Sequence, residues 1–360
     1  MNSVFVVVPC GLDDPTRVSG GNRYDRRICD ELRNARWTVA EIAASGSWPR
    51  PDASALRALR RSLDALPDGA VVLVDGLVAS GAAAVLVPRS ARLRLVVLVH
   101  MLFGGDAVGE RDEAGVLACA RAVLTTSDWT RGQLLDRYWL PPARVHVAHP
   151  GTDPVPAGLS TPDGGRLLCV GTISRLKGQD LLVEALAGLT GLPWRCTLVG
   201  PLDREPGVLR ALERRAGVAG IAGRLRLTGP RTGADLQLEY RDADLVLVPS
   251  RAETYGMVVT EALAAGVPVL ATAVGGIPEA LGRTAAGVVP GLLVPPDNVA
   301  ALAAALVRWL TEADLRSRLR RASLRRRETL PHWGATGDRI RAVLAAVSAE
   351  PDPPFLRVAR

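Results

Sequence analysis

A strand–loop–helix–strand unit between residues 245 and 272 constrains the fold of this chain most. An apolar run from Leu245 to Val248 stops at Pro249, and a polar loop then leads into a helix rich in Ala, Val and Leu. Gly266-Val267-Pro268 ends that helix and precedes a second apolar run, from Val269 to Thr272. Buried strands joined by a helix are typical of a parallel sheet. The unit therefore predicts an α/β domain.

Two carboxylates flank the predicted start of this helix. Glu253 lies in the loop and Glu261 in the second helical turn. The backbone N–H groups of Gly256, Met257 and Val258 have no acceptor within the helix, and with the helix dipole they suit a diphosphate. Carboxylates beside a phosphate would repel it, so we expect them to accept hydrogen bonds from sugar hydroxyls. The stretch predicts a site for a nucleotide with a sugar at each end of its diphosphate.

The pattern Glu253-x7-Glu261 resembles the signature of the retaining glycosyltransferases of family 4. The flanking Pro249-Ser250 and Gly266-Val267-Pro268-Val269 strengthen the resemblance; an isolated Glu pair would more often be a solvated helical stripe. Members of this family adopt the two-domain GT-B fold. The resemblance implies an α/β architecture of two Rossmann-like parallel-sheet domains that face each other across a cleft, with a C-terminal helix crossing back to the first domain.

The length of 360 residues exceeds that of one ordinary domain and favours two. The segment from Pro154 to Gly165 is rich in Pro and Gly and is the best candidate for a linker. We expect an acceptor-binding Rossmann-like domain over residues 1–160 and a nucleotide-sugar-binding one over 161–330. Residues 331–360 are expected to form the returning helix and a tail.

The net charge of +7 and the pI near 9.7 fit an anionic ligand, an acidic membrane surface or nucleic acid. The basic segment from Arg316 to Arg327 is expected to be a solvated helical face rather than a membrane patch, although weak peripheral membrane contact stays open. The cysteines are scattered, without a CxxC pair or zinc spacing, which indicates buried thiols in a reducing compartment. No apolar stretch is long enough to span a bilayer. We therefore expect a cytoplasmic protein.

A second phosphate loop is expected after the strand from Arg166 to Gly171. Lys177-Gly178 matches the family's Gly-Arg-…-Lys-Gly element, in which Arg and Lys meet the donor diphosphate. Thr172 stands where the family usually has Arg, and Arg175 follows three residues later, so its contact with the phosphate is open. A charge-assisted hydrogen bond of this kind is worth about 2–3 kcal/mol. The competing interpretation of Lys177 is a solvated turn lysine.

Other strand ends add weaker candidates. Backbone from Leu227 to Arg231 is expected near the nucleotide base, by analogy with the family. Asp242-Ala243-Asp244 is formally an Asp-x-Asp pair, a metal-binding pattern in other glycosyltransferases. It precedes the strand that begins at Leu245, at the end opposite the ligand edge, and predicts a strand-entry turn. No metal is expected.

In the first half, Gly20-Gly21 follows a polar loop and precedes a helical pattern from Asn22 to Arg36. It resembles the family's phosphate-approaching loop, where glycine lets backbone come close to a ligand. His100 follows the apolar run from Leu93 to Val99, and a polar residue at the carboxyl end of a central strand lies where ligands bind. It resembles the family's histidine near the reacting sugar; the alternative is a core histidine bonded to backbone.

The resemblance implies a retaining, metal-independent transfer of a hexosyl unit from a UDP- or GDP-sugar to an acceptor hydroxyl, with no other cofactor. It assigns catalytic roles to Glu253, Lys177 and His100. The residues expected to bind the donor are Gly20, Gly21, Arg175, Lys177, Glu253, Tyr255, Gly256, Met257, Val258, Glu261 and Arg231.

The acceptor is expected to be a small molecule, a glycan or a lipid-linked compound, with no nucleic-acid partner, and the protein a monomer or homodimer. Another GT-B enzyme of epimerase or hydrolase type and an inactive sugar-nucleotide-binding protein remain alternatives. An NAD-dependent dehydrogenase is disfavoured because no Gly-x-Gly-x-x-Gly follows a strand with an acidic residue at the right distance.

Overall fold

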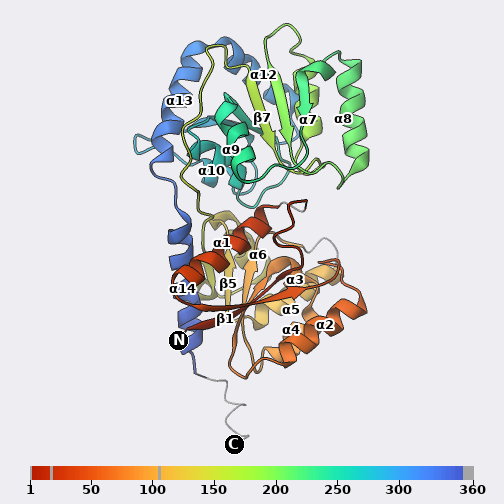
Figure 1. Ribbon diagram of the computed structural model, residues 1–360, viewed down its shortest axis with the longest axis vertical. Helices are drawn as coiled ribbons and strands as arrows, with labels where there is room; N and C mark the ends of the chain where they lie inside the picture. The colour runs from red at the N-terminus through yellow and green to blue at the C-terminus, as the bar shows by residue number, and fades with distance from the viewer. Residues whose placement is uncertain (1, 17–18, 104–106, 352–360) are drawn as a thin grey trace, which may run out of the picture. The chain divides into compact units, whose positions relative to one another are not determined.

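The computed structural model describes residues 2–16, 19–103 and 107–351. They form two compact α/β units, each built on a six-stranded sheet (Figure 1). Unit 1 consists mainly of residues 2–14, 20–151 and 333–351, and unit 2 of residues 152–332. Every strand pairing in the described residues is parallel. The predicted α/β class, with two parallel-sheet domains, is confirmed.

The sheet of unit 1 has the strand order β2-β1-β3-β4-β5-β6. Its strands are β1 (Ser3–Pro9), β2 (Thr38–Ala44), β3 (Val71–Asp75), β4 (Arg94–Val99), β5 (Ala122–Thr125) and β6 (Val145–Val147). Its helices are α1 (Gly20–Asn34), α2 (Ala53–Asp64), α3 (Gly76–Ser80), α4 (Ala83–Leu86), α5 (Ala107–Cys119), α6 (Asp128–Tyr138) and α14 (Trp333–Ala349).

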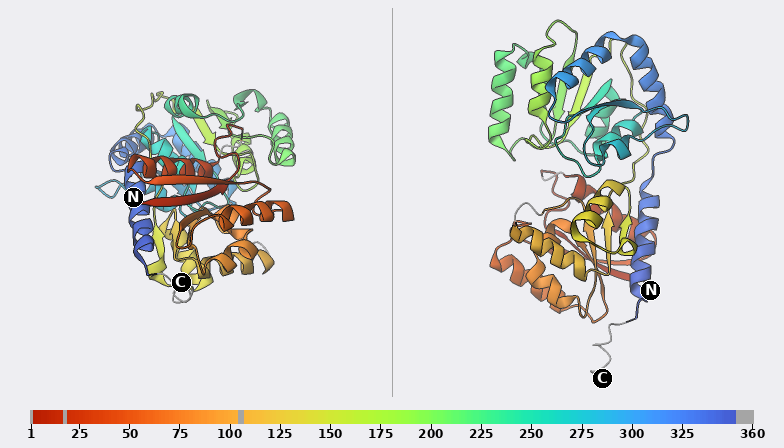
Figure 2. Two further views of the ribbon diagram at one scale, coloured as in Figure 1. Left: turned by 60° about the horizontal axis from the view of Figure 1, so that its bottom comes forward. Right: turned by 180° about the vertical axis from the view of Figure 1, so that it is seen from behind.

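Helices cover both faces of this sheet. The apolar side chains of α2 to α5 pack with Val72, Val74 and Val97 in one core. Helices α1 and α14 lie side by side and apart from α2 and α4 (Figure 1, Figure 2). α14 is tied to the unit by Thr336, whose Oγ1 donates to the carbonyl of His149 at 2.8 Å. The C-terminal helix thus belongs to unit 1, while the expected tail over residues 352–360 lies outside the described residues.

The sheet of unit 2 has the strand order β12-β11-β10-β7-β8-β9. Its strands are β7 (Arg166–Val170), β8 (Arg195–Val199), β9 (Leu225–Leu227), β10 (Leu245–Val248), β11 (Val269–Thr272) and β12 (Gly291–Val294). Its helices are α7 (Gln179–Ala187), α8 (Pro206–Val218), α9 (Gly233–Asp242), α10 (Met257–Ala264), α11 (Ile277–Leu281), α12 (Val299–Thr311) and α13 (Ala313–Arg327).

The central strands of unit 2 alternate between two cores, as the period of two in a strand requires. Leu245 and Leu247 of β10 pack with α7, α8 and α12. Val246 and Val248 of the same strand pack with α9, α10 and α11. Both faces of the sheet are therefore buried, which explains why the strand reads as one continuous apolar run.

The expected linker is bound to unit 2. Gly158 N donates to the carbonyl of Ala265 and Leu159 N to that of Arg241, both at 2.9 Å. These bonds place the segment from Thr152 onward with unit 2, so the chain divides near residue 151 rather than at the expected 160. The high content of Pro and Gly predicted a linker, but composition does not indicate the unit with which the backbone of the linker forms hydrogen bonds.

The expectation of a solvated basic face on α13 is correct for only part of the helix. Arg316, Arg320 and Arg327 donate to the carbonyls of Pro162, Gly158 and Val155, and so fasten the linker to unit 2. The arginines that remain exposed on α13 are Arg318, Arg321 and Arg325. Among the described residues, no helix has the length and apolar character needed to cross a membrane.

Candidate functional site

The loops after β7 and β10 leave unit 2 at its topological switch point. β7 is the first strand of this sheet; β8 pairs with one of its edges and β10 with the other. In open parallel sheets, ligands bind outside the carboxyl ends of the strands at such a point. The loop after β7 carries Lys177 and the loop after β10 carries Glu253. The structure thus brings together two residues that lie 76 positions apart in the chain.

The loop after β7 is held from inside the unit. The side chain of Gln179 is buried, and its Nε2 donates to the carbonyl of Thr172 at 3.1 Å. Gly178 has φ of 70°, and a Cβ there would come within 2.1 Å of the carbonyl oxygen of Pro249. Only glycine allows the two loops to approach this closely. Gly178 therefore sets the spacing between the Lys177 and Glu253 loops.

The loop after β10 is held by the glycine pair that follows β11. Gly276 N donates to the carbonyl of Glu253 at 3.1 Å. Gly275 has φ of 52°, and a Cβ there would lie 1.6 Å from the same carbonyl oxygen. The backbone of Glu253 is thus fixed by contacts that tolerate no side chain, which orients its carboxylate.

Lys177 and Glu253 form an ion pair, in which Lys177 Nζ donates to Glu253 Oε1. Ser250 Oγ donates to the same oxygen at 3.3 Å. The lysine side chain is 31% exposed and the glutamate 14%, so both remain open to a ligand. Lys177 is also the one lysine among the 44 Lys and Arg residues of the chain. A compact ammonium binds phosphate as a point charge and differs in this from guanidinium.

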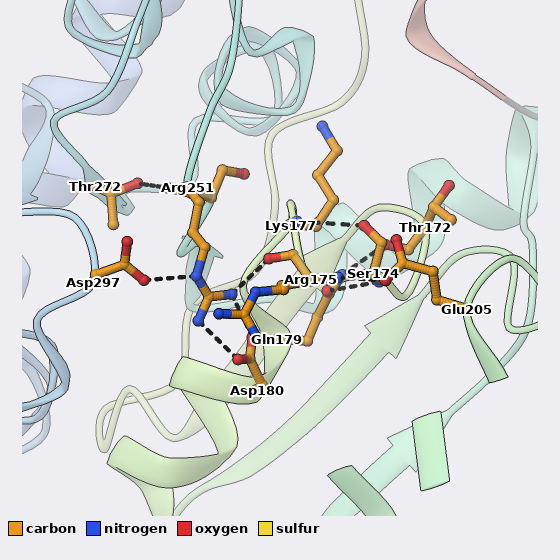
Figure 3. A network of polar contacts seen from close by, with 11 residues as sticks. Thr172, Ser174, Arg175, Lys177, Gln179, Asp180, Glu205, Arg251, Thr272 and Asp297 are labelled. Atoms are coloured by element: carbon orange, nitrogen blue, oxygen red, sulfur yellow. Dashed lines mark hydrogen bonds and ion pairs between the residues drawn. The ribbon is translucent and has the colours of Figure 1, made fainter. Parts of the chain in front are cut away.

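Arg251 joins the two loops from the other side. Its guanidinium donates to both carboxylate oxygens of Asp180 at 2.8 Å, to Asp297 Oδ1 at 2.6 Å and to the carbonyl of Arg175 at 2.6 Å. Figure 3 shows it between Asp180 and Asp297, with the side chain of Lys177 directed elsewhere. The hydrogen bond to Asp180 outweighs partial burial and, with that to Asp297, raises the pKa of Arg251. Sequence reasoning missed this contact.

The loop that carries Glu253 leads directly into the amino end of α10. The helix begins at Met257 after Gly256, which has φ of 92°, and no side chain caps it. The N–H groups of Gly256, Met257 and Val258 have no acceptor within the described chain. The predicted helix start and its free donors are confirmed. Tyr255, by contrast, is buried in the core, and this burial raises its pKa.

Glu261 is held by a residue that sequence reasoning missed. Tyr240 of α9 is buried, and its hydroxyl donates to Glu261 Oε2 at 2.6 Å. The carboxylate on α10 is therefore oriented by a side chain of the neighbouring helix α9. The sequence contains no pattern that would predict this contact, because Tyr240 and Glu261 lie on different helices.

Two other cations predicted to bind the donor, Arg175 and Arg231, form few bonds to the rest of the protein. The side chain of Arg175 is exposed, and its guanidinium forms no hydrogen bond or ion pair with the described residues, whereas its backbone N donates to Glu205 Oε2 at 3.2 Å. Arg231 is exposed and pairs with Asp235 at 3.8 Å. Neither side chain is fixed in place. Of the three cations predicted to bind the donor, Lys177 is therefore the one whose side chain the unit itself positions.

The Asp-x-Asp pair lies where the sequence predicted, at the amino end of β10. Asp244 is buried, and its carboxylate accepts hydrogen bonds from Thr161 N at 2.7 Å, Thr161 Oγ1 at 2.6 Å and Arg166 N at 2.8 Å. These bonds give Asp244 a structural role between the linker and β7.

In unit 1, His100 follows β4, a central strand, as predicted. Its Nε2 lies 2.7 Å from Asp25 Oδ1 and 3.4 Å from Asp75 Oδ2, and both carboxyl groups are buried. The ring packs edge-on against Tyr24, with centroids 5.2 Å apart. The alternative of a core histidine bonded to backbone is wrong: His100 belongs to a cluster of ionisable side chains.

Gly20 and Gly21 form the first turn of α1 rather than a loop before it, so the expected helix start at Asn22 is wrong. A Cβ on Gly21 would lie 3.3 Å from Cδ2 of His100. The glycine pair lets the helix start close to the imidazole ring. This contact explains the glycine at position 21 without reference to a phosphate.

Asp75 and His100 hold their protons more tightly than free side chains do. Burial, followed by the charge of Asp25, raises the pKa of Asp75 to about 8. Burial opposes the charged form of His100, yet the charge and hydrogen bond of Asp25 and the charge of Asp75 outweigh it and raise the pKa of His100. Asp75 therefore keeps its proton at neutral pH, and the charged form of His100 is favoured.

Both halves of the chain match models of protein families. Residues 16–155 match one described as Glycosyltransferase Family 4, and residues 164–312 match one described as Glycosyl transferases group 1. A D-inositol 3-phosphate glycosyltransferase from Catenulispora acidiphila is 34% identical over 294 residues, which cover 73% of this chain and 69% of that protein. One from Kineococcus radiotolerans is 35% identical over 257 residues, 65% of this chain and 58% of that protein.

The chain spans about half to three fifths of several such relatives, for instance 52% of the one from Salinispora arenicola. Among solved structures, Anabaena HepE in complex with UDP and glucose aligns with a TM-score of 0.79 at 18% identity, over 96% of this chain and 100% of that one. Sucrose-phosphate synthase from Thermosynechococcus elongatus aligns with a TM-score of 0.77 at 21% identity, over 97% and 100%. These likenesses show the fold.

Proposed function

This chain belongs to glycosyltransferase family 4, and from that membership we propose that it moves a hexosyl unit from a UDP- or GDP-sugar to an acceptor hydroxyl with retention of configuration. The observation that carries the proposal is the meeting of Lys177, Glu253 and the uncapped amino end of α10 at the switch point of unit 2. A cation and free N–H donors there suit a diphosphate, and the carboxylates suit sugar hydroxyls.

The diphosphate is proposed to bind between Lys177 and the N–H groups of residues 256–258. When the bond to the anomeric carbon breaks, negative charge grows on the departing diphosphate. A lysine ammonium and fixed N–H dipoles aimed at that charge lower the barrier because they are already oriented. In this account the protein supplies the positive charge and no metal is needed.

The two carboxylates are proposed to hold the sugars on either side. Glu253 would accept hydrogen bonds from hydroxyls of the transferred hexose, and its fixed backbone sets that geometry. Glu261, oriented by Tyr240, would accept them from the ribose. His100 of unit 1 is proposed to contact the reacting sugar. The Anabaena HepE structures contain UDP, glucose and UDP-glucose, which supports a nucleotide sugar as the ligand class.

The acceptor is proposed to be a polyol or sugar hydroxyl. Curated relatives are named for D-inositol 3-phosphate, which makes this compound and other cyclitol phosphates the first acceptors to test. A free glycan or a lipid-linked sugar would follow.

The test measures release of nucleoside diphosphate from a panel of UDP- and GDP-sugars, with and without acceptors and with and without EDTA. We expect acceptor-dependent release that EDTA leaves unchanged, and a product whose anomeric configuration, read by NMR, equals that of the donor. Epimerised donor, acceptor-independent hydrolysis or no turnover with any donor would contradict the proposal. Loss of turnover in EDTA would contradict its metal-free mechanism, and an inverted product the proposed retention.

A further inference from the structure

The donor site in unit 2 leaves the side chains around His100 unexplained. Asp25 on α1 and Asp75 at the end of β3 are both buried, and both direct a carboxyl oxygen at one ring nitrogen of His100. Two buried carboxyl groups opposite one imidazole are costly to assemble unless their charge is matched. The cluster therefore has a specific electrostatic state, and His100 is its one partly exposed member.

Packing fixes the orientation of the ring. Gly21 lies against Cδ2, and Tyr24 meets the ring at an interplanar angle of 74°. Nε2 faces Asp25 at hydrogen-bonding distance, 2.7 Å. Nδ1 has no hydrogen-bond partner within the described part of the chain, and the side chain is 15% exposed. The edge that carries Nδ1 is thus the one left for a ligand.

The charges favour the doubly protonated ring. Oδ2 of Asp25 is buried and has no hydrogen-bond partner in the described chain, so the charge of this carboxylate is poorly solvated. A cation beside it offsets that cost. Asp25 and Asp75 are the ionisable groups that act on His100 from α1 and β3, and both raise its pKa against the effect of burial.

We infer that Asp25 is a positioning residue that holds His100 as an imidazolium, with Nδ1–H directed at an oxygen of the substrate. The protonation of the ring decides whether Nδ1 can donate a hydrogen bond to the substrate. If Nε2–H donates to Asp25 and the ring is neutral, Nδ1 carries a lone pair and can only accept a hydrogen bond. Protonation turns Nδ1 into a charged donor, which suits an oxygen on which negative charge develops. The identity of that substrate rests on the proposed function; the coupling of Asp25 to His100 does not.

A divalent metal ion is the competing occupant. One ligand atom from each of Asp25, Asp75 and His100 lies within 4.8 Å of the others. A metal at that point would need Nε2 deprotonated, whereas the 2.7 Å separation from Asp25 is that of a hydrogen bond. The two states predict opposite protonation of Nε2, so a measurement on the ring decides between them.

The first experiment is an NMR titration of protein labelled with ¹³C and ¹⁵N in histidine. The chain has four histidines, and a His100→Gln variant identifies the signal of His100. In the wild type we expect both nitrogens protonated at pH 7. In Asp25→Asn the pKa of His100 should fall by about one unit or more, because a carboxylate in contact shifts a partner by about 1–3 units. Asp30→Asn, on the exposed side of α1, is the matched control and should leave the pKa of His100 unchanged.

The second experiment compares the pH dependence of kcat. Because the protonated ring is the active one, activity should fall as pH rises through the pKa of His100. Asp25→Asn should lose about tenfold or more at a pH between the two His100 pKa values that the titration gives, and much less at a pH below both, because there the ring is protonated in both proteins. A residue that only supports the fold would lower activity equally at both values. If Asp25→Asn does not fold, Asp75→Asn serves instead, with a smaller shift in the same direction.

The inference is overturned if His100 titrates at the same pH with and without Asp25, if Nε2 is unprotonated in the wild type, or if EDTA changes the His100 signal. If the wild type turns over no sugar nucleotide but the titration gives the expected shift, the proposed function fails while the pairing of Asp25 with His100 stands.

Discussion

Two polar clusters, one in each unit, lie at the carboxyl edge of a parallel sheet and are built in opposite ways. In unit 2 the side chains of Lys177 and Glu253 are 31% and 14% exposed, while the backbone beneath them is fixed by glycine contacts. In unit 1 the side chains of Asp25 and Asp75 are 2% and 5% exposed and meet His100, which is 15% exposed. The cluster of unit 2 leaves its cation accessible, whereas the cluster of unit 1 buries its two carboxyl groups.

The difference separates two tasks. An accessible ammonium can leave its carboxylate partner for a phosphate at low cost, because water screens both states. A buried carboxyl pair cannot change partners so easily, but burial lets it set the protonation of a neighbour. We infer that unit 2 recognises charge on the ligand, whereas unit 1 fixes the charge of one ring.

The largest effect is expected from Lys177. Lys177→Ala should reduce transfer at least about tenfold, and about a hundredfold if the lysine acts on the departing diphosphate as strongly as a preorganised donor does, about 2.7 kcal/mol. Lys177→Arg should also be impaired, because a planar guanidinium places its donors differently. Steady-state kinetics with the best donor measures this. The control is Arg318→Ala, which removes an exposed cation of α13; an equal loss in both variants would count against a special role for Lys177.

Gly275→Ala should reveal how far the Glu253 loop depends on close backbone approach. The added Cβ would lie 1.6 Å from the carbonyl oxygen of Glu253, so the loop must move. We expect a loss of about 1–3 kcal/mol in the free energy of unfolding, measured in urea, and weaker donor binding. Gly287→Ala also has positive φ, 77°, but no atom within 4 Å of the added Cβ. Equal losses in the two variants would show that backbone strain, rather than the contact with Glu253, is responsible.

The buried cluster predicts a pH dependence of stability. The pKa of Asp75 is about 8 in the folded protein and near 3.8 in the unfolded chain. Because its folded value is raised, the stabilisation is complete below the unfolded pKa and is lost as pH rises towards 8. The wild type should therefore lose stability relative to Asp75→Asn between pH 5 and 8, by at most about 1.4 kcal/mol per pH unit. Parallel curves of unfolding free energy against pH would contradict this.

A smaller effect is expected from Arg251, which touches the loops and not the proposed ligand. Arg251→Lys should raise the donor KM about threefold to tenfold with little change in kcat, because lysine cannot bind Asp180 through two nitrogens. Arg318→Lys, on an exposed face of α13, should leave KM unchanged. A fall in kcat alone would place Arg251 in the chemistry instead.

The sequence predicted those parts of the site that depend on local pattern. The strand–loop–helix–strand unit around Glu253 and the position of His100 after a central strand are confirmed, since apolar runs, Pro and Gly report local conformation. Lys177 also lies where its motif placed it. The contribution of each residue to binding stays a prediction.

What the sequence could not predict are partners distant along the chain. Asp25 meets His100 across 75 positions, and Arg251 meets Asp180 across 71. Spacing gives the face of a helix that a residue occupies, but the order of strands in the sheet decides which loops become neighbours. The helix start at Gly20 was misplaced for a related reason. Glycine usually indicates a loop, but here Gly21 lies inside the helix, where the absence of a Cβ leaves room for the ring of His100.

The most direct test of the account is a structure of the protein bound to the nucleoside diphosphate of its best donor. We predict the diphosphate against the amino end of α10, within hydrogen-bonding distance of Lys177 Nζ and of the N–H groups of Met257 and Val258, with the ribose hydroxyls at Glu261. A diphosphate bound elsewhere, or one that leaves Lys177 on Glu253 and touches neither, would contradict the account.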